Sequence, residues 1–124
     1  MWLCALDELL TEAGRKAYKD IRDAHHDGCM VLGLRYARNR SLHGDVIAMA
    51  VGHGGAALGM MQLGNAGLGQ APSYRWRARA TLPPMLPRFE RPDQQQAYDA
   101  HLSGRPILAA VHAAFAYLRA EAGL

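Results

Sequence analysis

Three side chains that lie close together in the sequence could carry out acid–base chemistry on a phosphate. Arg38, Asn39 and His43 supply a guanidinium, an amide and an imidazole. An imidazole titrates near neutral pH and can move a proton to or from a hydroxyl. A guanidinium binds phosphate through two parallel hydrogen bonds and stabilises charge on it. With Asn39 orienting either group, this set could move a proton at a phosphate ester without a metal ion or another cofactor.

The apolar residues around this motif predict the helix that positions it. They recur at helical spacing before, within and after the motif, as Met30, Val31, Leu34, Ala37, Leu42, Val46 and Ile47. On such a helix Asn39 and His43 are four residues apart and share a face. Arg38 lies about 140° around the helix from His43, at roughly 100° per residue. The long Arg38 side chain could still reach toward the same phosphate as His43, and a kink or a second protomer would help.

The pattern R-N-x-x-x-H formed by Arg38, Asn39 and His43 resembles the signature of the HEPN superfamily. These are small helical proteins, many of which are metal-independent ribonucleases of the toxin or defence type. The resemblance implies that Arg38 and His43 are a catalytic pair, with Asn39 as the polar residue beside them. It also implies a homodimer whose two motifs face a shared cleft, RNA as substrate, and an antitoxin or host protein as partner. The motif falls earlier in this chain than is usual in HEPN proteins.

A second resemblance extends along more of the chain. The segments L-R-Y-x-R-N-x-x-x-H, Y-x-W-R-x-x-x-x-L-P (Tyr74 to Pro83) and A-Y-x-x-H-L-x-G-R-P (Ala97 to Pro106) resemble small proteins of actinobacteria and their phages. No function comes with that resemblance. It favours an alternative to the nuclease, a non-enzymatic interaction protein that binds a host protein or nucleic acid. In that case the motif could simply hold its helix to the following loop.

Arginine is frequent and is concentrated in one segment. The chain has 14 basic and 11 acidic residues, for a net charge of +3. Between Ser73 and Ala80 arginines alternate with aromatic or small residues, which is the period of a half-buried strand. Such a row could hold nucleic-acid backbone, or equally be an edge strand whose charges discourage aggregation. The nucleic-acid-binding residues that we expect are Arg35, Arg40, Arg75, Arg77 and Arg79.

The length and pattern of the chain predict one mainly α-helical domain over residues 1–124, a small helical bundle. A helix over residues 2–13 either ends at Gly14 or continues through it. The middle of the chain is Gly-rich, and one strand or hairpin is expected near residues 73–81.

Two further helices are expected near the C-terminus. Asp93 caps a short helix that reaches His101, and a last helix starts with Pro106 in its first turn and ends at Gly123. The apolar stripe of the last helix consists of Ile107, Leu108, Val111, Phe115 and Leu118.

Other classes of protein fit the sequence less well. His25, His26 and Asp27 are adjacent, so their side chains point apart and favour a solvated turn over a metal site. The uncharged run over residues 46–68 contains too many glycines for a good membrane span. Residues 52–57 match G-x-G-x-x-A, but no acidic residue follows at the spacing that a dinucleotide site needs. Two cysteines and an N-terminus without a basic region indicate the cytoplasm.

Overall fold

The computed structural model describes residues 2–51 and 73–124. Its elements, in chain order, are α1 (Trp2–Ala24), α2 (His26–Leu42), β1 (Ala48–Val51), β2 (Ser73–Trp76), α3 (Pro92–His101) and α4 (Ile107–Glu121). Two single-turn 3-10 helices, at Arg79–Thr81 and Pro87–Phe89, lie in the proline-rich connection before α3. The structure confirms the predicted fold class, a small and mainly helical bundle with one hairpin.

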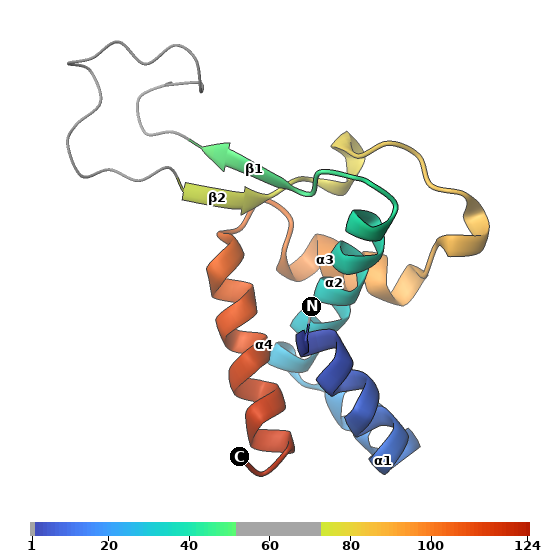
Figure 1. The fold of residues 1–124 in the computed structure, drawn as a ribbon, viewed down its shortest axis with the longest axis vertical. Coiled ribbons are helices and arrows are strands. Elements are labelled where there is room, and N and C mark those ends of the chain that lie inside the picture. The colour runs from blue at the N-terminus through green and yellow to red at the C-terminus, as the bar shows by residue number, and fades with distance from the viewer. Residues whose placement is uncertain (1, 52–72) are drawn as a thin grey trace, which may run out of the picture.

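Helix α2 is the centre of the bundle. It packs against α1, α3 and α4, and the hairpin lies across one end of the bundle (Figure 1). The apolar side chains with the least exposure come from α2, α3, α4 and the residue after α3, namely Val31, Tyr98, Leu102, Ala114 and Leu118. Because α2 has neighbours on several sides, about half of its residues are buried, and the helix that carries the motif is well fixed.

The boundaries of the first two helices differ in part from the prediction. Helix α1 continues through Gly14, which is the second of the two alternatives. The prediction that the next helix extends to Val46 and Ile47 was wrong, because α2 ends at Leu42. Gly44 has a φ of +88°, a left-handed conformation that glycine adopts without strain, and this residue turns the chain toward β1.

The hairpin pairs β1 with β2 in antiparallel register, with Met49 opposite Arg75. Strand β1 was not predicted, and β2 is shorter than the alternating segment because the chain forms a 3-10 turn at Arg79. Of the two aromatic residues expected on the buried side, Trp76 is 6% exposed but Tyr74 is 54% exposed. Only Trp76 lies at the end of the hairpin that meets the helices, which explains the difference.

Helix α4 is buried through a stripe that only partly matches the predicted one, because Ile107, Val111 and Leu118 pack on the core but Leu108 and Phe115 do not. Its buried residues are Ala110, Ala114, Tyr117 and Leu118. Leu108 is 65% exposed and Phe115 is 39% exposed, so the prediction that both belong to the core was wrong. The buried face of α4, which packs on α2, thus combines two small alanines with Tyr117 and Leu118.

The Gly-rich middle of the chain, including the G-x-G-x-x-A match, lies outside the described residues. Across residues 2–51 and 73–124, none of the helices combines the length and the apolar character needed to cross a bilayer.

Candidate functional site

Arg38 lies in α2 and faces the carboxylates of α1. Its Nη2 atom is 3.0 Å from Glu8 Oε1, and Arg35 Nη2 lies 3.7 Å from the same oxygen. Arg35 Nη1 is closer still to Asp7, at 2.6 Å from Oδ2. Two of the arginines that we expected to contact phosphate therefore join α2 to α1 through ion pairs.

Asp7 is the centre of this network and is fully buried. Tyr18 donates its hydroxyl to Asp7 Oδ1 at 2.7 Å, and Arg22 Nη1 donates to both carboxylate oxygens at 3.0 Å. Burial, followed by the hydrogen bond to Asp7, raises the pKa of Tyr18 far above its usual value. A carboxylate with this many donors is a satisfied structural ion, because each oxygen has partners and little remains for a substrate.

Asn39 and Arg40 attach α2 to other parts of the molecule. Asn39 Nδ2 donates to Gln94 Oε1 of α3 at 3.2 Å. Arg40 is buried, donates to the Pro83 carbonyl, and lies 2.6 Å from Asp45 Oδ2 through Nε. These contacts hold the end of α2 to α3 and to the loops on either side of the hairpin.

His43 is the most accessible member of the motif. It is the C-cap of α2, its ring is exposed, and its centroid lies 4.7 Å from that of Phe89. The ring borders a hollow of about 190 Å³ that Arg40 and Asp45 also line. An exposed imidazole in this position is free to exchange protons with a bound molecule.

Arg38 borders a different and larger cavity. This cavity, of about 400 Å³, lies between α1, α2, α4 and the hairpin, and is lined by Trp2, Leu3, Cys4, Leu34, Ala37, Arg38, Ile47, Trp76, Val111, His112 and Phe115. Within one chain, the described structure thus places Arg38 and His43 at separate hollows. A site that uses both would need the second protomer that the helical geometry already suggested.

The arginines of the strand segment also have partners in the chain. Arg75 donates to the Gly104 carbonyl at 2.9 Å. Arg77 donates to the carbonyls of Val46 and Thr81 at 3.0 and 2.8 Å. The third, Arg79, pairs with Asp99 at 2.8 Å. These contacts orient the guanidinium groups along the protein, and phosphate would have to compete with them or use the remaining N–H groups.

The histidines between α1 and α2 have structural contacts. His25 caps α2 by accepting a hydrogen bond from the Asp27 N–H at 3.2 Å, and its ring lies 5.0 Å from that of Tyr117. His26 packs edge to face on His101. Among the residues that the structure describes, there is no group of three or more His, Cys, Asp or Glu side chains arranged to hold a metal.

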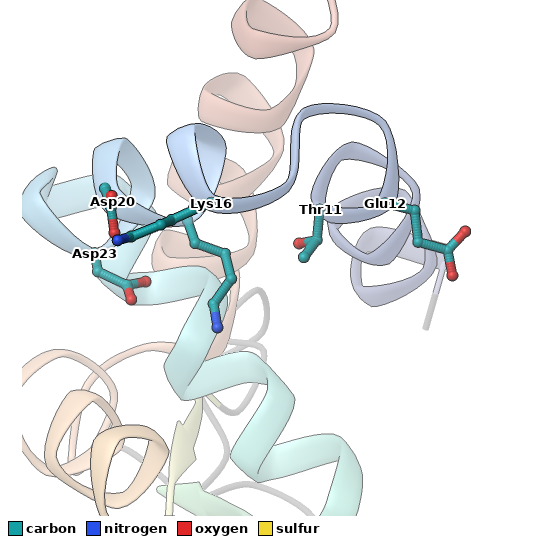
Figure 2. A pocket seen from close by; sticks show the side chains of 6 residues that line it. Thr11, Glu12, Lys16, Asp20 and Asp23 are labelled. Carbon is teal, nitrogen blue, oxygen red and sulfur yellow. The ribbon is translucent and has the colours of Figure 1, made fainter.

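A further hollow of about 780 Å³ lies along the outer surface of α1. Thr11 and Glu12 lie on one side of it and Lys16, Asp20 and Asp23 on the other (Figure 2). It is open and its acidic and basic side chains are mixed, which is typical of a solvated helix surface and does not indicate a particular ligand.

Sequence reasoning did not single out the cavity beside Arg38. Its walls come from both ends of the chain, with Trp2 and Cys4 on α1 and His112 and Phe115 on α4, and no local spacing relates them. The edge-to-face contact of Trp2 with Phe115, with ring centroids 5.4 Å apart, can be found only in three dimensions. Comparisons of the chain with protein-family models, with curated proteins and with solved structures return no match, so its function is argued from this geometry.

Proposed function

We propose that the protein is a non-enzymatic interaction protein that binds a protein partner through the outer face of α4. The observation that supports this proposal most is the set of large apolar side chains that this face exposes. Leu108 is 65% exposed, Phe115 is 39% exposed, and the adjoining Trp2 of α1 is 60% exposed. We call these three residues the α4 face.

The charges around the α4 face favour a protein over a nucleic acid as the partner. From Ile107 to Leu118 the helix has no Asp, Glu, Lys or Arg, and His112 is its one ionisable side chain of the physiological range. Nucleic-acid surfaces bind mainly through cations that neutralise phosphates. Aromatic residues without neighbouring charges are enriched instead at the centres of protein interfaces.

The contacts that Arg38 and Asn39 make within the chain also support a binding role. Arg38 is paired with Glu8, and Asn39 with Gln94. Both contacts join α2 to neighbouring helices and so explain these residues without catalysis.

The experiment is a comparison of affinity capture by wild type, by a double variant and by a matched control. Leu108→Ser with Phe115→Ser removes the apolar groups of the α4 face, whereas Ile21→Ser removes an exposed apolar side chain elsewhere, on α1. We expect a partner that wild type and Ile21→Ser bind and the double variant loses. Sedimentation of the same three proteins shows whether that partner is a second copy of the chain. Equal capture by all three would contradict the proposal.

The second candidate is the HEPN-like ribonuclease or a ribonuclease-derived RNA-binding protein. The exposure of His43 at the end of α2 favours it, because a general acid or base has to reach its substrate. In this proposal two protomers bring the Arg38 of one chain and the His43 of the other to a single phosphate.

The test is cleavage of labelled RNA in EDTA by wild type, His43→Ala and His112→Ala. We expect wild type and His112→Ala to cleave and His43→Ala to be inactive, because only His43 belongs to the motif. If none of the three folded proteins cleaves RNA, the ribonuclease proposal is excluded and the interaction protein is left.

A further inference from the structure

The cavity beside Arg38 has an apolar and well-buried interior. Leu3, Cys4, Leu34 and Ala37 are each at most 8% exposed and come from two helices that are packed together. Trp2 and Phe115 stand at its more exposed side. Its volume of about 400 Å³ lies in the range of pockets that hold small organic molecules, roughly 300 to 1,000 Å³.

The polar groups of the cavity are mostly hydrogen-bond donors. Arg38 and Trp76 can only donate, and the His112 ring has one N–H donor beside one acceptor nitrogen. Among the described residues that line the cavity there is no carboxylate. A ligand that suits this lining therefore brings acceptor oxygens to the donors and an apolar body to the interior.

Two of these donors lack a partner. Arg38 Nε and Trp76 Nε1 are buried and have no hydrogen-bond partner in the described parts of the chain. A buried donor without an acceptor is costly and therefore uncommon in folded proteins. Arg38 and Trp76 both line the cavity, so acceptor oxygens of a molecule bound there would lie beside both residues.

The charge of Arg38 is only partly compensated. Its carboxylate partner, Glu8, is 44% exposed, and the same oxygen of Glu8 also lies near Arg35. Two guanidinium groups thus share one partly solvated carboxylate, which leaves Arg38 able to attract an anion. Burial raises the pKa of the Cys4 thiol in the cavity interior, so Cys4 stays neutral and contributes apolar surface.

We propose that this cavity binds an amphiphilic organic carboxylate, with its alkyl or aryl body against Leu3, Leu34 and Ala37 and its carboxylate at Arg38 and Trp76. The binding is non-covalent and reversible. This inference goes beyond the proposed function and does not depend on it, because a small ligand and a protein partner are measured separately.

Fluorescence gives a direct test, because both tryptophans of the chain line the cavity. Decanoate is titrated beside decanol and decylammonium, which have the same chain length but a neutral or a cationic head group. We expect decanoate to bind about tenfold more tightly than either, as for a charge-assisted hydrogen bond. We also expect 10-bromodecanoate to quench the fluorescence. Equal binding of all three head groups, preference for decylammonium, or no binding would each overturn the proposal.

A variant of Arg38 tests whether this residue binds the carboxylate head group. Arg38→Gln keeps a polar side chain without the charge. This variant should lower the affinity for decanoate about tenfold and leave the affinity for decanol unchanged. The control, Arg91→Gln, removes an exposed guanidinium outside the cavity and should bind both like wild type. Unchanged decanoate affinity in a folded Arg38→Gln protein would overturn the role of Arg38. If that variant does not fold, the head-group series on wild type decides.

Discussion

At the scale of single residues, the contacts of Arg35 and of the motif residue Arg38 are with acidic residues far away in the sequence. Arg35 forms an ion pair with Asp7, and Arg38 forms one with Glu8. Both carboxylates lie on α1, the preceding helix. The residue types alone indicated phosphate binding, because a guanidinium recognises phosphate and carboxylate with the same geometry. Which of the two it meets depends on how α1 packs against α2, and local spacing does not contain that information.

Asp7→Asn should destabilise the protein strongly. The change removes the charge that compensates two guanidinium groups at a fully buried position. Loss of one partner from a buried ion pair costs about 3 to 5 kcal/mol, because the remaining charge stays out of water. The free energy of unfolding, measured by urea titration with circular dichroism, checks this value.

Glu8→Gln on the same helix is the matched control. Glu8 also pairs with two arginines but is 44% exposed, so solvent can replace it. Its loss should cost less than about 1 kcal/mol. Equal losses for the two variants would contradict the view that Asp7 carries the network.

At the scale of elements, the closest approach of α2 and α3 is at Gly33. A Cβ added there would lie 2.6 Å from Leu102 Cδ1 and 3.4 Å from the Ala97 carbonyl oxygen. Leu102 is fully buried, so its side chain would have to shift within the core. The absence of a side chain at Gly33 therefore sets the spacing of the two helices.

Gly33→Ala should consequently destabilise the protein by about 1 to 3 kcal/mol, as expected for overpacking of a core. Gly14→Ala is the control, because it adds the same methyl group to an exposed position inside α1. Its closest described neighbour would be Tyr18 Cβ at 3.3 Å, and the gain in helix propensity of about 1 kcal/mol offsets that crowding. Urea titration of both variants gives the comparison, and a stabilised Gly33→Ala would show that the helices can move apart.

The elements were predictable where the sequence is strongly periodic. The helices that became α2, α3 and α4 follow from apolar spacing and from proline and glycine near their ends. The starts of α3 and α4 differ from the prediction, because Arg91 and not Asp93 is the N-cap of α3, and Pro106 is the N-cap of α4 and not part of its first turn. Strand β1 was missed because its uncharged residues, Ala48–Val51, have no alternation to separate a strand from a buried helix. The buried side of α4 was predicted only in part, because two of its buried residues, Ala110 and Ala114, are alanines, which carry little weight in a hydrophobic stripe. The α4 face and the cavity beside Arg38 were therefore beyond prediction.

At the scale of the whole molecule, the hairpin is joined to the bundle through Trp76. The backbone N–H of Trp76 donates to the Arg105 carbonyl at 3.0 Å, and the backbone carbonyl of Trp76 accepts from the Gly104 N–H at 2.9 Å. The Trp76 ring is buried and also lies edge to face with Tyr98 of α3. The hydrogen bonds reach the connection between α3 and α4 and the ring contact reaches α3, so detachment of the hairpin would expose part of the core.

The prediction of a single domain over residues 1–124 can be tested through the same residue. In a Trp2→Phe variant Trp76 is the only tryptophan, and its fluorescence reports the hairpin while circular dichroism at 222 nm reports the helices. If the chain unfolds as one cooperative unit, the two urea transitions should coincide, as they do for two-state domains. Because Trp76 has both hydrogen bonds and ring contacts to the bundle, we expect coincidence. An earlier fluorescence transition would mean that the hairpin opens by itself, and the cavity that Trp76 lines would then open with it.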